Sequence, residues 1–127
     1  KRIKAAKAWS IWEGSTVKLI QNKALIEHSS DSRFAEAFSR IECHYFTNNG
    51  WFDTDNYLIE NIDKIRHIPT VIVHGRYDVV CPVENAWELH KAWPESDLHI
   101  IPDSGHAMSE EGIKDKLIEY TDKFSKL

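Results

Sequence analysis

The hydrophobic period of the chain changes after Pro69, and this change limits the folds that its second half can adopt. Residues 70–74 read Thr-Val-Ile-Val-His, a β-branched run that ends at Gly75. The run is continuous rather than alternating, which is typical of a strand covered on both faces. The pattern therefore predicts a buried strand over residues 70–74.

The residues after this strand predict a helix, a second strand and a last helix. Pro82 sits where a helix commonly begins, and an apolar stripe of helical spacing follows it to about residue 93. Residues 98–101 read as a second strand, and Ser109 is predicted to begin the last helix. Strand, helix, strand, helix with short connections predicts a parallel sheet with crossover helices. The fold class predicted for this half is α/β.

The edges of such a sheet are a further constraint. Two parallel strands cannot cover their own edges, and each needs a neighbour on both sides. We therefore expect the sheet to be completed by residues upstream of Lys1, the remainder of its own polypeptide, or by another chain. The isolated chain is expected to expose an apolar sheet edge and to associate with itself.

The first half of the chain has helical spacing instead. One helix is predicted from Lys1 to about Glu13 and is expected to end at Gly14-Ser15. A second is predicted to begin at Ser30 or Asp31 and to end at residues 48–50, Asn-Asn-Gly, which accept a left-handed backbone. A short helix is expected over residues 55–65. The apolar stripes that define the first two helices are Ala5, Ala8, Trp9 and Trp12, then Phe34, Phe38, Ile41 and Tyr45.

The charge of the chain argues against nucleic acid and membrane partners. Sixteen basic against twenty acidic residues leave a formal net charge of −4, without a basic stripe interleaved with aromatic residues. The same balance disfavours an anionic membrane surface, and the longest apolar runs are too short to span a bilayer. We see no N-terminal leader, and a sequence that opens at Lys1 without Met is expected to be a piece of something longer.

The cysteines and histidines give no metal-binding pattern. Cys43 and Cys81 lack CxxC spacing, and none of the seven histidines falls in a ligand motif such as HExxH. We therefore expect no metal and no cofactor. Two free thiols, predicted to be buried or partly buried, favour a reducing cytoplasm over a secreted disulfide framework.

Two titratable side chains follow the two predicted strands. Asp78 closes the segment Gly-Arg-Tyr-Asp after the first strand, and His106 closes Asp-Ser-Gly-His after the second. Functional groups of open α/β sheets gather beyond the carboxyl ends of the strands, so these two residues, 28 positions apart, can meet if the strands are neighbours. An Asp that orients a His, which in turn takes a proton from a nucleophile, is the pairing of a catalytic triad.

Each of the two segments also has an ordinary structural interpretation. A lone GxxD loop is commonly a turn or a helix cap, and a lone GH after a strand is commonly a solvated or packed histidine. Both together, in this order and each at a strand end, favour the catalytic pair.

Four segments of the chain carry longer motifs. They read Ala-Trp-Ser-Ile-Trp-Glu-Gly at 8–14, Arg-Ile-Glu-Cys-His-Tyr-Phe at 40–46, His-Gly-Arg-Tyr-Asp-Val-Val-Cys-Pro at 74–82 and Ser-Gly-His at 104–106. They resemble the WSxWEG, RIENHYF, GRYDxxCP and AGH segments of proline iminopeptidases, which are serine hydrolases of the α/β-hydrolase class. The likeness covers nearly the whole chain, from about Ala5 to Phe124, and the three longer motifs in this order are specific.

The resemblance implies a fold, an activity and a site. Residues 1–52 would be part of a helical cap, and residues 53–127 the C-terminal part of the α/β-hydrolase core. The family releases N-terminal proline from peptides, with Asp78 and His106 as the triad carboxylate and base. By the same resemblance, Glu13 and Glu42 would bind the substrate ammonium and Phe46 would contact the pyrrolidine ring. Glu42 and Phe46 are four apart, which places them on one ridge of a helix.

The sequence departs from the family at the nucleophile. No GxSxG elbow occurs in the 127 residues, and in the family the Ser precedes the Asp and the His. We therefore expect this chain to be a C-terminal portion that is inactive alone. Cys43 stands where the family more often has Asn, which bears on the hydrogen bonding around Glu42.

Two alternatives stay open at this point. The missing Ser also fits a non-catalytic binding or assembly module that keeps the hydrolase fold. A capped α/β-hydrolase that acts on another substrate is the third possibility.

Overall fold

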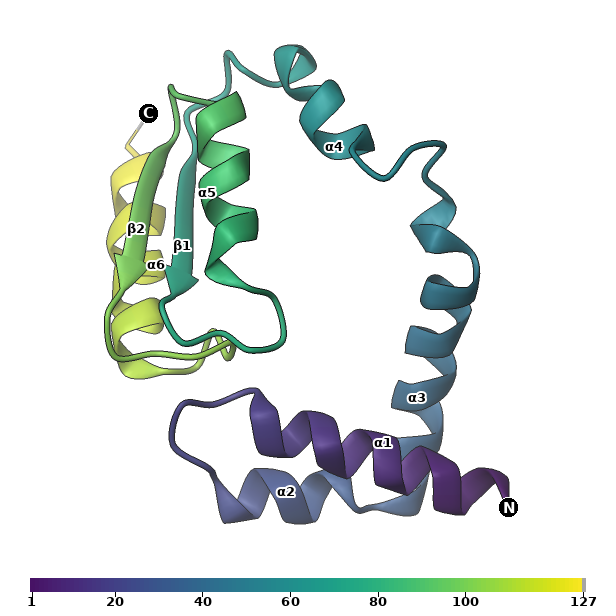
Figure 1. The fold of residues 1–127 in the computed structure, drawn as a ribbon. Helices are drawn as coiled ribbons and strands as arrows, with labels where there is room; N and C mark the ends of the chain where they lie inside the picture. The colour runs from purple at the N-terminus through teal and green to yellow at the C-terminus, as the bar shows by residue number, and fades with distance from the viewer. Residues whose placement is uncertain (127) are drawn as a thin grey trace. The chain divides into compact units, whose positions relative to one another are not determined.

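Two parallel strands joined by a helix form the centre of the second half of the chain. The computed structural model describes residues 1–126. Strand β1 (Val71–Gly75) pairs in parallel with β2 (Asp97–Ile101), with Val71 opposite Asp97 and Gly75 opposite Ile101. Parallel neighbours need a crossover connection, and α5 (Val83–Ala92), which follows Pro82 directly, supplies it. The predicted parallel α/β unit is confirmed (Figure 1).

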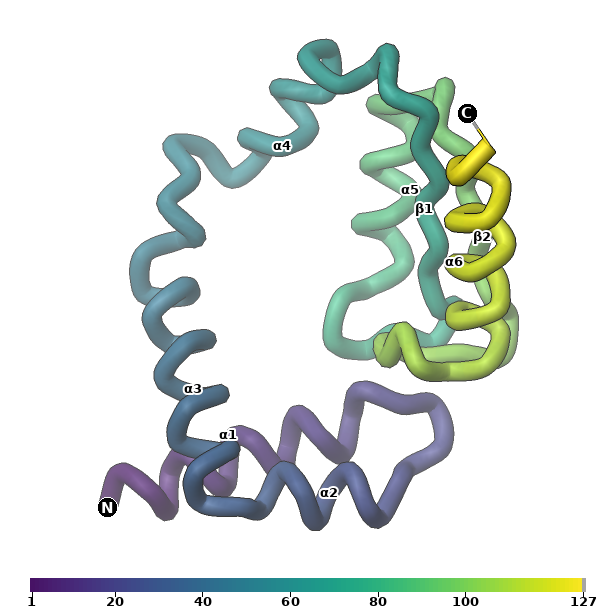
Figure 2. Tube along the Cα trace, turned by 180° about the vertical axis from the view of Figure 1, so that it is seen from behind, coloured from purple at the N-terminus to yellow at the C-terminus, as the bar shows by residue number. Residues whose placement is uncertain are grey.

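Two helices cover this pair of strands. Helix α5 contacts both strands and α6 (Glu111–Phe124) contacts β1, so that the strands run between the helices (Figures 1 and 2). The buried apolar side chains of this part come from the 3-10 turn η2 (Ile62–Lys64), from α5 and the residue after it, from β2 and from α6; they are Ile62, Ala86, Trp93, Ile101, Ile113 and Tyr120.

The strand β1 is less buried than its sequence predicts. Residues 71–74 are only partly buried, whereas the continuous β-branched run predicts a strand covered on both faces. The reason is the number of strands, because the described residues form a two-stranded sheet that leaves part of each strand open.

Small residues build the core of the helical part. Helices α1 (Arg2–Thr16), α2 (Lys23–Ser29) and α3 (Ser32–Thr47) pack together, α1 against both others. On α1 the buried positions include Ala6, Ser10 and Gly14, spaced by four, and they lie along one ridge of the helix. On α3 the buried residues are Ala35 and Ser39, and the Ser39 hydroxyl donates to the Ala6 carbonyl at 3.1 Å.

The aromatic stripes that define α1 and α3 in the sequence are therefore not the buried faces. Trp9 and Trp12 are 38% and 53% exposed, and Ile41 and Tyr45 are 61% and 54% exposed. Small side chains let two helix backbones approach closely, and this close approach leaves the large side chains outside the contact.

The predicted end of the first helix is wrong for the same reason. Helix α1 continues through Gly14 to Thr16. A Cβ atom at Gly14 would overlap the side chain of Ser29 on α2, so the glycine serves helix packing and not termination. The hydroxyl of Ser15 donates to the carbonyl of Ile11, one turn back, and so adds no break.

The remaining boundaries differ by smaller amounts. The sequence analysis missed α2 and predicted one helix over residues 55–65, where the structure has α4 (Tyr57–Glu60) and a short 3-10 turn, η2 (Ile62–Lys64). The predicted left-handed end of α3 is present at Asn49 and Gly50, which have φ of 49° and 60° in a second 3-10 turn, η1 (Asn49–Trp51). Helix α6 begins two residues after the predicted Ser109.

The chain divides into two units that are described separately. One contains residues 1–16 and 20–57, and the other contains residues 17–19 and 58–127. The short segment Val17–Leu19 therefore groups with the α/β unit. The assignment of residues 1–52 to a cap and of 53–127 to a hydrolase core stays a prediction.

Two further expectations concern the surface. Cys43 and Cys81 form no disulfide, and both are exposed rather than buried, because each lies outside the small cores described above. Among residues 1–126, every helix is too short or too polar to traverse a lipid bilayer.

The N-terminus of α3 is capped by the side chain of Asp31, and this cap can be tested. Asp31 Oδ1 accepts from the backbone N–H groups of Arg33 and Phe34, both at 2.9 Å, and the Phe34 bond is the main cause that lowers the pKa of Asp31. A carboxyl whose folded pKa lies below its unfolded value stabilises the fold above that unfolded value and loses this effect as the pH falls through the folded pKa.

We expect Asp31→Ala to lower the thermal unfolding midpoint near neutral pH, and the difference from wild type to shrink at about pH 3. Asp31→Asn, which keeps an acceptor oxygen, should lower the midpoint less. Circular dichroism at both pH values measures this, with Asp53→Asn, an exposed acid outside the cap, as the control. An Ala variant with the wild-type midpoint at neutral pH would contradict the role of the cap.

Candidate active site

Asp78 lies in the loop after β1, where its carboxylate is held by the backbone of the following turn. Its Oδ1 atom accepts from the backbone N–H of Val80 at 2.9 Å and from that of Cys81 at 2.8 Å. The residue is only 8% exposed although it carries a charged group. These two donors fix one carboxylate oxygen and leave the other free to face a different partner.

His106 lies in the loop after β2, and its ring meets the second oxygen of Asp78. The distance from His106 Nδ1 to Asp78 Oδ2 is 2.9 Å. An ionised carboxylate only accepts, so Nδ1 donates and Nε2 of the neutral ring is left as a proton acceptor. The Asp78 side chain is 4% exposed and that of His106 is 38% exposed. The arrangement is a buried carboxylate that orients an accessible base.

The absence of a side chain at Gly75 lets these loops lie close together. A Cβ atom at Gly75 would overlap the backbone carbonyl of Gly105 and would lie 2.6 Å from that of Ser104. The Ser104 carbonyl also accepts from the N–H of Tyr77 at 3.0 Å, which ties one loop to the other. The site therefore depends on a position without a side chain at the end of β1.

The two side chains open into a cavity of about 300 Å³. Its polar walls include His74, Asp78 and His106, and its apolar walls include Met108 and Ile113. Within residues 1–126, no cluster of three or more His, Cys, Asp or Glu side chains is placed to bind a metal ion.

The His106 loop is anchored by a segment far away in the sequence. The Val17 carbonyl accepts from the N–H of His106 at 3.0 Å and from that of Ala107 at 2.7 Å. Glu110 Oε1 accepts from Gly105 N–H at 2.8 Å, and Glu110 Oε2 accepts from Leu19 N–H at 3.1 Å. One carboxylate therefore joins the His106 loop to residues 17–19.

Sequence reasoning missed Glu110 and Val17. The only signal was an acidic residue next to the start of the last helix, which ordinarily indicates an N-cap. Glu110 occupies the N-cap position of α6, but its side chain makes no capping bond there. Its side chain instead accepts from the backbone N–H groups of Gly105 and Leu19, and a local sequence pattern cannot predict such contacts.

The residues predicted to bind the substrate lie in the helical unit. Glu42 Oε2 accepts from the indole N–H of Trp9, and the Trp9 ring meets the Phe46 ring edge-on with centroids 6.4 Å apart. Phe46 is 62% exposed, whereas Glu13, near the end of α1, is 9% exposed. The structure thus brings Glu42 and Phe46 together around Trp9.

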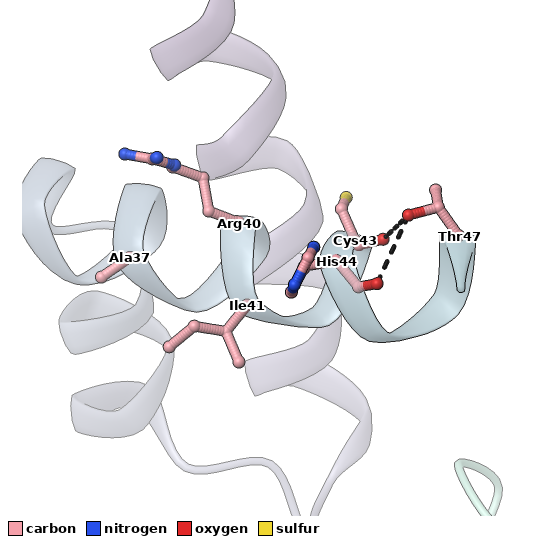
Figure 3. Close-up of a pocket in the computed structure, with 6 residues that line it drawn as sticks. All are labelled: Ala37, Arg40, Ile41, Cys43, His44 and Thr47. Carbon is pink, nitrogen blue, oxygen red and sulfur yellow. Dashed lines mark hydrogen bonds between the residues drawn. The ribbon is translucent and has the colours of Figure 1, made fainter. Parts of the chain in front are cut away.

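A further hollow lies on the surface of α3. It is lined by Ala37, Arg40, Ile41, Cys43, His44 and Thr47, all from this one helix (Figure 3). The Thr47 hydroxyl already donates to the backbone carbonyl of Cys43 at 2.7 Å. A hollow lined by a single helix has no opposing wall, so it lacks the convergent polar groups of a ligand site.

Comparison with known proteins identifies the class of the fold. The alpha/beta hydrolase fold family matches residues 11–113, which include both strands, Asp78 and His106. The chain belongs to this family.

Individual relatives narrow the identification. The chain is 59% identical over 123 residues to a probable proline iminopeptidase of Leptolyngbya boryana, covering 97% of this chain and 38% of that protein. It is 50% identical to the proline iminopeptidase of Arabidopsis thaliana, covering 97% of this chain and 32% of that protein. It is 41% identical over 117 residues to the Neisseria gonorrhoeae enzyme, covering 92% of this chain and 36% of that protein.

These matches confirm the resemblance to proline iminopeptidases. They also show that the chain spans only about a third to two fifths of the length of these relatives, a C-terminal portion of them. A fragment of such an enzyme without the nucleophile is consistent with this coverage.

The Glu110 bridge can be tested by amide hydrogen exchange. In Glu110→Ala the N–H groups of Gly105 and Leu19 lose a charged acceptor, and we expect each to exchange roughly tenfold faster. Exchange of individual amides, followed by NMR, measures this. Glu111→Ala is the matched control, because Glu111 is the exposed neighbour on the same turn. Unchanged exchange at both amides in Glu110→Ala would show that the bridge is not formed in solution.

Proposed function

We propose that this chain is the part of a serine-type proline iminopeptidase that carries the triad Asp and His. The hydrogen bond between Asp78 Oδ2 and His106 Nδ1 at the carboxyl ends of adjacent parallel strands is the observation that carries this proposal. The relatives named proline iminopeptidase, which match nearly all of the chain, support the same activity.

The proposed reaction is acyl transfer from a prolyl peptide bond. A Ser hydroxyl from the remainder of the polypeptide attacks the prolyl carbonyl while His106 Nε2 takes its proton. The proton then passes to the leaving amine, and the prolyl-enzyme ester remains. Water, deprotonated by the same nitrogen, attacks the ester, and the proton passes to the departing Ser oxygen as proline is released. Asp78 keeps the ring in the Nδ1–H tautomer and stabilises its cationic form.

Substrate selection is proposed to reside in the helical unit. The substrate has a secondary ammonium at one edge and an apolar ring elsewhere. Glu42 and Phe46 lie one turn apart on α3 and both contact Trp9, which supports a carboxylate beside an aromatic ring. Glu13 is proposed as the second carboxylate. A peptide with a blocked N-terminus would leave these acids without a cation, which gives selectivity.

The remainder of the polypeptide is the proposed partner of the exposed apolar surface. The half-buried strand β1 and the exposed side chains of Ile41 and Tyr45 need a cover that the described residues do not supply. The relatives are about three times as long as the matched portion, so their additional residues can provide it. Without them, self-association of the isolated chain is the expected alternative.

The proposed compartment is the cytoplasm. Cys43 and Cys81 are exposed and form no disulfide, and exposed thiols of this kind are typical of a reducing environment.

The experiment that tests the function compares the complete gene product with residues 1–127 alone. We expect the complete protein to hydrolyse a prolyl chromogenic amide, and residues 1–127 to show no activity above the uncatalysed rate. Asp78→Asn in the complete protein should lower kcat by roughly 10⁴-fold, because the wrong His tautomer is then favoured. An enzyme-like rate from residues 1–127, or full activity of the Asn variant, would overturn the proposal.

The same assay separates the two alternatives. A simple ester hydrolysed in preference to the prolyl amide would indicate a capped α/β-hydrolase with another substrate. Failure of the complete protein to react with a fluorophosphonate, a reagent for activated serines, would indicate a non-catalytic module that kept the fold.

A second prediction concerns the substrate ammonium. Glu42→Gln keeps the hydrogen bond from Trp9 but removes the negative charge. The substitution should therefore lower kcat/KM for substrates with a free prolyl ammonium and not for N-acetylprolyl substrates. We expect kcat/KM for the prolyl amide to fall roughly 10- to 100-fold, the value of a charge-assisted contact. Steady-state kinetics with both substrates measures the ratio.

Glu36→Gln is the matched control for that substitution. Glu36 lies on the same helix and pairs with Arg2 at 2.7 Å, so its substitution removes a charge from α3 while leaving the bond between Trp9 and Glu42 in place. An equal fall in both variants would indicate a general effect of charge on α3.

A further inference from the structure

His74 is a second imidazole beside the Asp78 carboxylate. It is the residue of β1 immediately before Gly75. Its Nε2 atom lies 2.9 Å from the backbone carbonyl oxygen of Cys81 and 3.4 Å from Asp78 Oδ2. Both neighbours are acceptors, so Nε2 must carry a hydrogen, and this determines the tautomer of the neutral ring.

We propose that His74 is a positioning residue that holds the Asp78 carboxylate in the orientation required by His106, an inference that rests on the proposed triad. The bond to the Cys81 carbonyl ties the end of β1 to the turn over residues 78–81. That same turn supplies the two backbone N–H groups that fix Asp78 Oδ1. His74 therefore holds the turn whose backbone N–H groups fix the Asp78 carboxylate.

The proximity of His74 to the other carboxylate oxygen also favours the observed orientation of Asp78. Asp78 Oδ2 accepts from His106 Nδ1 at 2.9 Å, and the His74 Nε2 atom, whose hydrogen is donated to the Cys81 carbonyl, lies 3.4 Å from the same oxygen. A carboxylate rotated out of its plane would lose the bond from His106 together with those on Oδ1. The His74 side chain is 17% exposed and that of Asp78 is 4% exposed, so few water molecules can substitute for these donors.

His74 is not proposed to transfer a proton itself. Its Nε2–H is bonded to a backbone carbonyl, which cannot accept a proton at neutral pH. The ring therefore acts through Asp78, and its removal should lower the rate of nucleophile activation while leaving substrate affinity unchanged.

The test uses the complete protein and two readouts. The first is kcat and KM for a prolyl amide. The second is the rate at which a fluorophosphonate labels the nucleophilic Ser, which requires the triad but not the proline pocket. We expect His74→Ala to lower kcat and the labelling rate roughly tenfold with KM unchanged, as for loss of the one hydrogen bond that holds the turn over residues 78–81. His74→Gln, which retains an N–H donor at similar reach, should recover most of the loss.

A control histidine separates this role from fold stability. His99 lies on β2 and its Nε2 is 2.7 Å from the Tyr120 hydroxyl, so it is a partly buried, bonded imidazole away from Asp78. His99→Ala should change the unfolding midpoint but leave the labelling rate of the folded protein unchanged.

A double-mutant cycle then decides whether His74 acts through Asp78. In an Asp78→Ala background, adding His74→Ala should cause no further fall in the labelling rate. Multiplicative effects of the two substitutions, or a wild-type labelling rate in His74→Ala, would overturn the inference. A complete protein that ignores prolyl amides, yet loses labelling in His74→Ala, would contradict the proposed substrate and support the role of His74.

Discussion

The close approach of two loops at Gly75 and Gly105 is the constraint on which the candidate site depends. Parallel pairing of β1 and β2 brings the ends of both strands to the same edge of the sheet, but strand pairing alone places backbone there and not side chains. Because Gly75 has no Cβ, the carbonyl of Gly105 can come against it, and the loops after the strands lie in contact. The 2.9 Å bond between Asp78 and His106 follows from this contact. A side chain at position 75 would separate the two groups even if both were retained.

Backbone groups hold both Asp78 and His106 in place, but these groups come from different segments of the chain. Asp78 takes two N–H groups from its own turn, which is local and needs no distant partner. His106 is held by the Val17 carbonyl, so the position of the base depends on a segment almost ninety residues earlier in the chain. Residues 17–19 directly follow α1, the helix that contains Glu13. Residues 17–19, the segment after the first helix, therefore belong to the α/β unit and support the position of His106.

The sequence predicted the parts of this fold that depend on local pattern. The β-branched run at 70–74, Pro82 before a helix, the second strand at 98–101 and the short connections between these elements were enough to predict parallel strands. The meeting of Asp78 with His106 was then predicted on the condition that the two strands are neighbours. The buried faces of α1 and α3 could not be predicted, because an apolar stripe marks a buried face only when large side chains make the helix contact. In this protein the small residues Ala6, Ser10 and Ala35 make that contact. Glu110 could not be predicted either, because it binds backbone N–H groups, and these carry no residue type that a pattern could detect.

The use of small residues in the helical core has a consequence for recognition. A helix pair that packs through Ala and Ser keeps its aromatic side chains free for other contacts, and Trp9 and Phe46 are exposed for this reason. The two rings contact each other, and the Trp9 indole is bonded to Glu42, which restricts the rotamers open to these side chains. An aromatic side chain whose rotamers are already restricted has less conformational entropy to lose in a further contact. The α/β unit does the opposite, since it buries the charged Asp78 and exposes the imidazole. The two units thus differ in what they expose: the helical unit exposes aromatic side chains beside Glu42, and the α/β unit buries the Asp78 carboxylate and leaves the His106 ring accessible.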